Sequence, residues 1–286
     1  MSIQETTKAP HGHRVHANGI DIHYLEQGEG EPLVLLHGGL VSTNSIWTGV
    51  PVAYAGHMDT LAEHFRVIAP DTRGCGRTVH TGGPISFDLL ADDVAALIAA
   101  LGLERPLIAG FSDGAITATI LGVRHPDTAR AIVNHAGFDE FDPQAPTFAM
   151  MRQILAGSPD ATAPDPDAAA HGFEASEQMR PMFELMKRDQ DSGQGDGHWR
   201  TYLRLCWERC TQHPGYGYAD LAKITVPTLI LAGDRDDFCT VEQAVTAYRQ
   251  LTDGELAILP GHGHYIPPAA VRATIEFFTR RLAAQS

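Results

Sequence analysis

Short apolar runs alternate with helix-like segments along most of this 286-residue chain. The apolar runs have the length of buried strands, and they cover residues 32–36, 67–69, 107–109, 131–133, 226–233 and 255–259. Residues 86–101 form the clearest amphipathic helix, because apolar positions recur every three or four residues between a Ser86 N-cap and the terminating Gly102. Strands that alternate with helices predict an α/β fold with a mostly parallel, doubly wound sheet.

The alternation stops between residues 139 and 218. Residues 158–167 are rich in Pro, Asp and Ala, which is typical of loops, and helical patterns return near 174–190 and 198–210. We therefore interpret 139–218 as an insertion between two parts of one core, residues 1–138 and 219–286.

Ser112 lies in the sequence Gly-Phe-Ser-Asp-Gly at residues 110–114, between the apolar run and a helix-compatible segment at 115–121. Glycines two residues before and after a serine allow a sharp turn from strand to helix, where a Cβ would collide with its neighbours. Such a turn exposes the hydroxyl and directs the first amides of the helix toward whatever the serine attacks. The pattern predicts a serine nucleophile. A serine in an ordinary loop is the alternative, which the flanking strand and helix disfavour.

A serine hydroxyl needs a base, and the base needs an acid that orients it. Three acids, Asp234, Asp236 and Asp237, follow the apolar run 226–233, and two histidines, His262 and His264, follow the run 255–259. Because the carboxyl ends of parallel strands meet at one edge of a sheet, we expect an acid and a histidine to converge on the serine.

Taken together, these features resemble the α/β-hydrolase superfamily over residues 14–282. The matching features are an opening hairpin at 14–24, a strand that ends in His-Gly at 37–38, an Asp-x-Arg-Gly-x-Gly-x-Thr loop at 71–78, the Gly-x-Ser-x-Gly turn, and the Gly-Asp-x-Asp and Gly-His segments, in the family's order.

The resemblance selects the acid and the base among these candidates. In the family pattern the acid lies three residues after the glycine that ends the strand, which indicates Asp236, and the Gly-His pattern indicates His264 rather than His262. A minority of relatives take the acid from the loop after the preceding strand, so Asp139 is the alternative acid.

Attack on a carbonyl also requires an oxyanion hole, and the loss of one donor raises the barrier by about 2.7–4 kcal/mol. We predict the backbone N–H groups of Asp113 and Gly39 as the donors, with Leu40 adjacent. His37 is expected to hold this loop by hydrogen bonds rather than to transfer protons.

Asp113 departs from the family pattern, because many relatives carry methionine, tryptophan or glutamine there. Its carboxylate could bind a substrate ammonium group, and a resemblance to hydrolases with Trp-Ser-Asp-Gly-Gly points to amino-acid esters. The alternative, which we favour, is that the side chain turns away and lies at a helix N-terminus, where the helix dipole favours an acidic residue.

In the resembled family, an insertion at 139–218 forms a helical cap over the active site and supplies the pocket walls. The candidate lining residues are Phe148, Met150, Met151, Phe183, Met186, Trp199, Tyr202 and Trp207. Trp47 and His135 are also expected near the pocket. For any one of these cap side chains, packing of the cap against the core is the simpler interpretation.

Composition narrows the class of partner. A formal net charge of −14 argues against nucleic acid or an anionic membrane, and the Cys and His residues show no zinc-ligand spacing, so we expect neither a metal nor a cofactor. Residues 1–5 lack the pattern of a signal peptide and no long apolar run is present, which favours a cytoplasmic location. We expect a small-molecule substrate and leave a homodimer open.

These features predict an esterase-type serine hydrolase that cleaves a carboxylic ester or lactone of a small to medium apolar substrate through an acyl-enzyme on Ser112. Cleavage of a thioester or a carbon–carbon bond would use the same residues. A ligand receptor or a non-hydrolytic biosynthetic catalyst could keep the same fold. An intact set of Ser, Asp and His argues against the receptor, because a binding module gains nothing from keeping all three.

Overall fold

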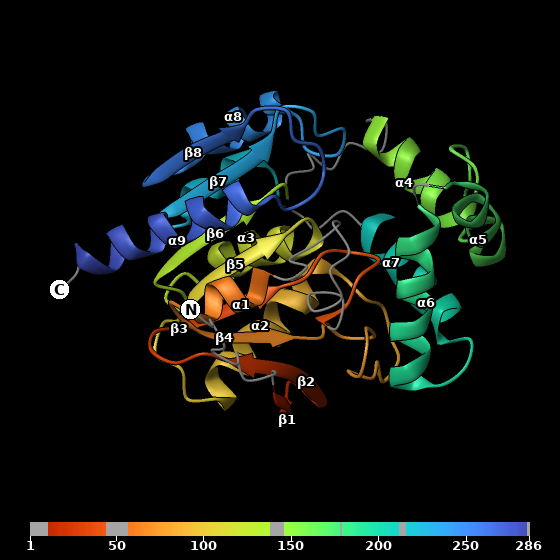
Figure 1. Ribbon diagram of the computed structural model, residues 1–286, viewed down its shortest axis with the longest axis horizontal. Coiled ribbons are helices and arrows are strands. Elements are labelled where there is room, and N and C mark those ends of the chain that lie inside the picture. Colours follow the sequence, from red (N-terminus) through yellow and green to blue (C-terminus); the bar gives the residue numbers. More distant parts are fainter. Residues whose placement is uncertain (1–10, 44–56, 138–145, 178, 212–215, 285–286) are drawn as a thin grey trace, which may run out of the picture.

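The computed structural model describes residues 11–43, 57–137, 146–177, 179–211 and 216–284. Within these ranges, eight strands form one sheet in the order β1-β2-β4-β3-β5-β6-β7-β8 (Figure 1). The strands are β1 (His11–Ala17), β2 (Ile20–Gln27), β3 (Pro32–Leu36), β4 (Arg66–Pro70), β5 (Leu107–Phe111), β6 (Ala131–His135), β7 (Thr228–Gly233) and β8 (Gly254–Leu259). β2 is antiparallel to both β1 and β4, and every other pairing is parallel. The predicted α/β fold with a mostly parallel sheet is confirmed.

Helices cover both faces of this sheet. They are α1 (His57–Ala62), α2 (Phe87–Ala100), α3 (Asp113–Arg124), α4 (Pro146–Ala156), α5 (Pro166–Ala175), α6 (Arg180–Gln194), α7 (His198–Thr211), the 3₁₀ helix η2 (Tyr218–Lys223), α8 (Val241–Gln250) and α9 (Pro268–Ala283). In Figure 1, α1 and α9 lie on the near face and α2 and α3 on the far face. Helix α2 begins where the pattern predicts, because the Ser86 hydroxyl accepts a hydrogen bond from the Leu89 N–H at 3.2 Å.

The central strands are apolar because both of their faces are covered. Every residue of β5, β6 and β7 is buried. The carboxyl ends of β3, β5, β6, β7 and β8 therefore meet at one edge of a rigid sheet, and the loops that follow them are held close together.

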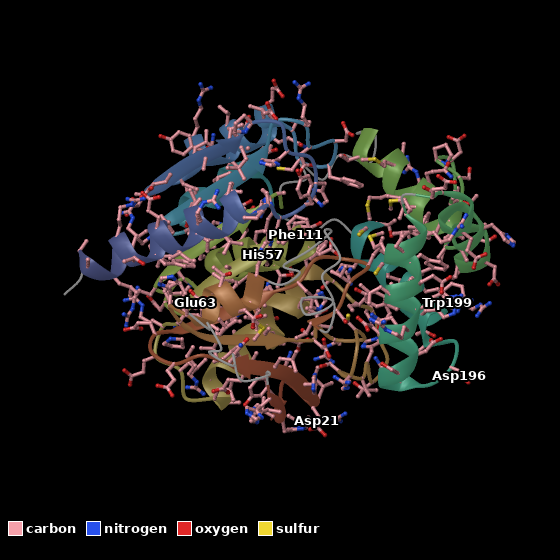
Figure 2. All side chains as sticks on the ribbon, in the orientation of Figure 1. Asp21, His57, Glu63, Phe111, Asp196 and Trp199 are labelled. Atoms are coloured by element: carbon pink, nitrogen blue, oxygen red, sulfur yellow. The ribbon has the colours of Figure 1, made fainter. Side chains whose placement is uncertain are left out.

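Helices α4 to α7 lie together beside this edge (Figure 1), and we name them the cap helices (residues 146–211). Trp199 is labelled among them in Figure 2. They form an apolar cluster of their own, which includes Phe173, Phe183, Trp199 and Leu203. The helical patterns near 174–190 and 198–210 correspond to α6 and α7, shifted by a few residues. The division into a core domain and an inserted cap domain remains a prediction.

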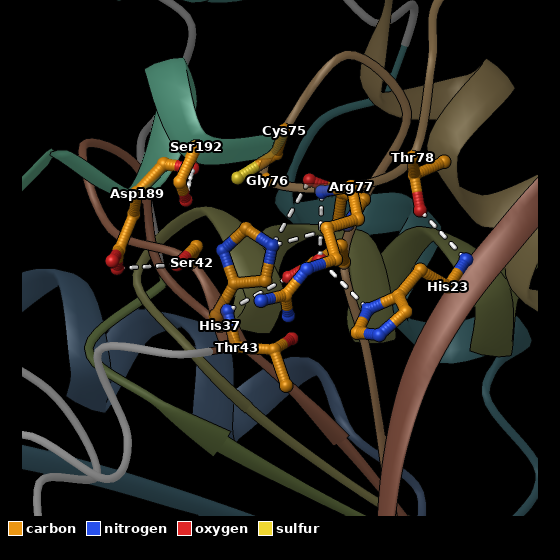
Figure 3. Close-up of polar contacts among 12 residues, drawn as sticks. His23, His37, Ser42, Thr43, Cys75, Gly76, Arg77, Thr78, Asp189 and Ser192 are labelled. Carbon is orange, nitrogen blue, oxygen red and sulfur yellow. Dashed lines mark hydrogen bonds and ion pairs between the residues drawn. The ribbon is translucent and has the colours of Figure 1, made fainter. Parts of the chain in front are cut away.

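Buried hydrogen bonds join the cap helices to the core. The Ser42 hydroxyl donates to an Asp189 carboxylate oxygen at 2.7 Å (Figure 3), and the Gly76 N–H donates to the Gln190 side-chain oxygen at 2.9 Å. These contacts place α6 against the loops after β3 and β4. Among the described residues, no helix combines the length and the apolar character needed to cross a membrane.

Candidate active site

Ser112 lies at the junction of β5 and α3, in a turn that only small neighbours permit. Its backbone has φ = 52°, a left-handed value that is costly for a residue with a side chain. A Cβ on Gly110 would collide with the Gly114 carbonyl, and a Cβ on Gly114 would collide with the Leu36 carbonyl. The strained turn therefore depends on both glycines, and it places the serine at the carboxyl end of the central strand.

Ser112, His264 and Asp236 form a continuous hydrogen-bonded series. The Ser112 Oγ lies 3.0 Å from His264 Nε2, and His264 Nδ1 lies 2.9 Å and 3.1 Å from the two carboxylate oxygens of Asp236. Because a carboxylate only accepts, Nδ1 carries the proton and Nε2 is free to accept the serine proton. These are the positions that a serine nucleophile, its base and an orienting acid require.

The acid is fixed by its own loop. The Asp236 side chain is fully buried, and its Oδ1 accepts hydrogen bonds from the backbone N–H groups of Phe238 at 2.8 Å and Cys239 at 2.9 Å. The His264 ring also contacts two aromatic rings, with centroid distances of 4.9 Å to Phe111 and 4.6 Å to Phe238. The imidazole is therefore held in place by packing as well as by the carboxylate.

The competing candidates take other positions. Asp234 Oδ1 accepts a hydrogen bond from the Gly261 N–H at 2.5 Å, which ties together the loops after β7 and β8. His262 Nδ1 lies 2.6 Å from the Tyr265 hydroxyl, within its own loop. Asp237 contributes to the wall of the cavity described below. Asp139, the alternative acid, lies outside the described residues.

The loop after β3 lies directly against the Ser112 turn. A Cβ on Gly38 would lie 3.3 Å from Ser112 Cβ, and one on Gly39 would lie 2.5 Å from Asp113 Oδ2. Asp113 is the first residue of α3, so its N–H has no acceptor within the helix. The N–H groups of Gly39 and Asp113 thus belong to two segments that meet beside the serine, as an oxyanion hole requires.

His37 fixes the orientation of this loop. Its Nδ1 donates to the Gly38 carbonyl at 2.7 Å, and its Nε2 accepts from the Thr72 N–H at 3.1 Å. In a trans peptide the C=O and N–H point in opposite directions, so the bond to the Gly38 carbonyl turns the Gly39 N–H away from His37. Burial lowers the pKa of His37, which keeps the ring neutral and able to accept from Thr72.

A second buried carboxylate supports the same loops. Asp71 accepts hydrogen bonds from the backbone N–H groups of Thr43 and Arg77, both at 3.0 Å, and His23 Nδ1 lies 3.0 Å from it. Burial alone would raise the pKa of Asp71, but these hydrogen bonds outweigh it and the pKa is lowered. The carboxylate stays charged and holds the loops after β3 and β4 together.

A cavity of about 650 Å³ opens above Ser112. Its floor includes Ser112, Asp113 and His264 from the core, and its walls are mainly apolar or sulfur-containing. The cap helices and the segment before α6 contribute Met151, Ile154, Leu155, Met179, Met182, Cys206 and Cys210. The core contributes Leu40, Phe87, Phe111, Phe238 and Tyr265 among others. Such a space suits a small to medium apolar ligand.

Several predicted pocket residues are not among the described residues that line this cavity. Phe183 and Trp199 pack edge-to-face within the apolar cluster of the cap helices, and Trp207 belongs to the same cluster. Their large rings satisfy the helices' own need for burial, and a role for them in substrate binding stays a prediction. Leu40 and Met151 do line the cavity, whereas Trp47 lies outside the described residues.

His135 lies below the cavity rather than in its wall. It ends β6, it is 4% exposed, and its ring packs edge-on against Phe111 at a centroid distance of 5.3 Å. Burial, with a smaller contribution from the neighbouring His264, lowers the pKa of His135 to about 3. His135 is therefore a neutral core residue that packs behind Phe111, near the pocket as expected, and a role for it in substrate binding stays a prediction.

One residue at the site was missed by the sequence interpretation. The Arg209 guanidinium of α7 donates to the Asp113 carboxylate, and this Arg209 side chain is only 2% exposed. Asp113 thus neither turns away from the cavity nor offers a free carboxylate to it. The sequence does contain a signal that Arg209 is buried. Trp199, Tyr202 and Cys206 follow each other at three- and four-residue steps, and the next step places Arg209 on the same apolar face of the helix.

In the described part of the chain, no group of three or more His, Cys, Asp or Glu side chains is placed to hold a metal ion.

Comparison with known proteins agrees with the fold. The chain matches the family model described as alpha/beta hydrolase fold over residues 31–268, and it belongs to that family. It is 26% identical to the 2-hydroxy-6-oxo-6-(2'-aminophenyl)hexa-2,4-dienoic acid hydrolase of Metapseudomonas resinovorans, over 98% of this chain and 95% of that protein.

The chain is also similar to two proteins whose names give other activities. It is 24% identical to the bifunctional esterase/perhydrolase of Acinetobacter calcoaceticus, over 87% of this chain and 91% of that protein. Its fold is similar to that of the enol-lactonase from Burkholderia xenovorans LB400, with a TM-score of 0.68, 21% identity, and 95% and 100% of the two chains covered.

Proposed function

We propose that this protein is a serine hydrolase that cleaves a carboxylic ester or lactone of a small to medium apolar substrate. The observation that carries the proposal is the 3.0 Å contact between Ser112 Oγ and His264 Nε2, with Asp236 behind the imidazole, at the floor of the cavity. A receptor that only binds its ligand has no need of this arrangement.

The reaction follows from the positions of the atoms. Ser112 Oγ attacks the carbonyl carbon while His264 Nε2 takes the hydroxyl proton, and the carbonyl oxygen becomes an oxyanion held by the N–H groups of Gly39 and Asp113. Collapse breaks the bond to the leaving alcohol, which receives the proton from His264. Water then attacks the acyl-enzyme, with His264 again as the base, and releases the acid and free Ser112.

Release of p-nitrophenol from p-nitrophenyl acetate, butanoate and octanoate tests this proposal. We expect turnover with a preference for a short or medium chain, and a loss of at least about 10⁴-fold in kcat in Ser112→Ala. Ser42→Ala is the matched control, because it removes a serine hydroxyl outside the cavity and should keep the activity. Equal rates near background for wild type and Ser112→Ala would contradict the proposal.

A second candidate is hydrolysis of a carbon–carbon bond beside a ketone. The relative from Metapseudomonas resinovorans favours it, because the acid in that protein's name carries no ester, so hydrolysis must break a carbon–carbon bond. A 2-hydroxy-6-oxo-dienoic acid is conjugated, and its cleavage is seen as a loss of absorbance. Faster loss of this acid than of any ester, dependent on Ser112, would select the second candidate.

A further inference from the structure

The carboxylate of Asp113 lies at a sensitive position for catalysis. Asp113 directly follows Ser112, its N–H is a predicted oxyanion donor, and the residue contributes to the cavity wall. Its Oδ2 would be 2.5 Å from a Cβ on Gly39, so the carboxylate lies against the loop that carries the other predicted donor. A free negative charge here would oppose the oxyanion and would attract positively charged substrates.

Arg209 supplies a positive charge at this position from the cap helices. Its Nη2 donates to Asp113 Oδ2 and lies 3.3 Å from Cys206 Sγ, and its guanidinium carbon lies 5.6 Å from the centre of the Phe87 ring. Nε and Nη1 are buried and have no hydrogen-bond partner among the described residues. Asp113 is therefore the anion that compensates this buried cation.

The two charges depend on each other. Burial on its own would lower the pKa of Arg209, but the carboxylate of Asp113 raises it, and the pKa ends well above its usual value. A buried cation that loses its partner is strongly destabilised, whereas Asp113, which faces the cavity, could be solvated. Removing Arg209 should therefore disturb the fold less than removing the charge of Asp113.

We propose that Arg209 determines the charge specificity of this site: by neutralising Asp113 it leaves no net charge on the side-chain pair beside Ser112. The site then selects substrates that are uncharged next to the scissile bond over those that carry an ammonium group. This inference rests on the proposed ester hydrolysis, and it assigns to the substrate an uncharged acyl group.

The experiment compares isosteric esters at pH 6.5 in four proteins: wild type, Arg209→Met, Asp113→Asn and the double variant. p-Nitrophenyl 3-aminopropanoate and butanoate differ only in an ammonium group in place of a methyl group. The p-nitrophenyl hemiester of succinic acid and the 4-methylpentanoate differ only in a carboxylate in place of an isopropyl group. The readout is the ratio of kcat/KM between the two members of each pair, which a uniform loss of activity does not change.

We expect Arg209→Met to raise the ratio of ammonium to neutral ester by at least about tenfold. Asp113→Asn should raise the ratio of carboxylate to neutral ester by a similar factor, because it leaves the cation uncompensated. The double variant should return both ratios to within about threefold of wild type. The two single changes act in opposite directions, so either one that folds tests the inference. Unchanged ratios, even with lower rates, would show that the pair only fastens the cap helices to the core.

Failure of the proposed function would look different. If wild type hydrolyses none of the esters, binding of the same intact esters to Ser112→Ala and to Ser112→Ala/Arg209→Met is measured by calorimetry. A tenfold gain in the affinity for the ammonium ester relative to the neutral ester, when Arg209→Met is added to Ser112→Ala, would support the charge specificity without turnover. Equal relative affinities would overturn it.

Discussion

The loops of the core and the cap helices meet at the same cavity, but they hold their functional side chains in different ways. In the core, a reactive side chain is fixed by its own loop, as the Phe238 and Cys239 amides fix Asp236. In the cap helices, packing is mostly apolar, and their polar contacts with the core come from single side chains such as Asp189 and Arg209. The proposed catalytic side chains therefore all come from the core, whereas the proposed selectivity depends on a contact between distant segments.

The largest effect is expected in the core, at Asp236. Asp236→Asn should lower kcat on the best ester by about 10⁴-fold, because an amide can donate to Nδ1 and favour the wrong tautomer of His264. The two backbone amides still have an oxygen to donate to, so the melting temperature should change little. Asp253→Asn is the control, because it changes a half-buried carboxylate that is paired with Arg281 and lies outside the cavity wall. A loss below tenfold in Asp236→Asn would mean that another acid orients the histidine.

The next largest effect is expected at Gly39, in the loop after β3. A change at Gly172, in the cap helices, serves as the comparison. Gly39→Ala should lower kcat by about 10²–10³-fold, because the new Cβ meets the Asp113 carboxylate and displaces one predicted donor. Gly172→Ala in α5 meets no atom within 4 Å, and it should raise stability by about 0.5–1 kcal/mol with unchanged kinetics. Steady-state kinetics and thermal unfolding check both changes, and equal kinetics for the two would contradict the assignment of Gly39.

A smaller effect concerns the stability of the core in acid. The pKa of His135 is about 3 in the folded protein and about 6.5 in the unfolded chain, so the unfolded chain binds more protons below pH 6.5. The free energy of unfolding should therefore fall as the pH drops from 6.5 toward 3, by about 1.4 kcal/mol per unit for this group, and be unaffected by it above 6.5.

Replacing this histidine should remove that part of the pH dependence. Between pH 7 and pH 5, His135→Gln should lose about 2 kcal/mol less stability than wild type. His171→Gln, an exposed histidine on the cap helices, is the control. Urea unfolding at the two pH values makes the comparison, and identical pH dependence in wild type and His135→Gln would contradict a neutral buried His135.

The smallest effect is expected at the contact between the two regions. Ser42→Ala removes a donor to the buried Asp189 carboxylate and should cost about 1.5 kcal/mol of stability. The value of kcat/KM should stay within threefold of wild type, because Ser42 lies outside the cavity wall. A large loss of activity would show that the position of α6 controls catalysis more directly than the structure indicates.

Much of the fold and the central part of the site were predictable from sequence, for a physical reason. A strand that turns sharply into a helix needs Gly110 and Gly114, and a buried central strand needs continuous apolar residues. Both features can therefore be recognised from a few consecutive residues. Local patterns at strand ends gave the candidate acids and histidines, and the resemblance to the α/β-hydrolase superfamily selected Asp236 and His264 among them. The residues of the pocket walls could not be recognised in this way, because a large apolar side chain in a helix fits a cavity wall and a packed cluster equally well.

The sequence by itself determined which elements form, in what order they follow, and which residues could carry out nucleophilic chemistry, since these depend on neighbours along the chain. Only the tertiary structure decided that Phe183 and Trp199 fill the cap cluster rather than the pocket. Only the tertiary structure, too, paired Asp113 with Arg209, 96 residues further along. A buried charge must find its partner in space, and the sequence does not record which distant segment will bring it.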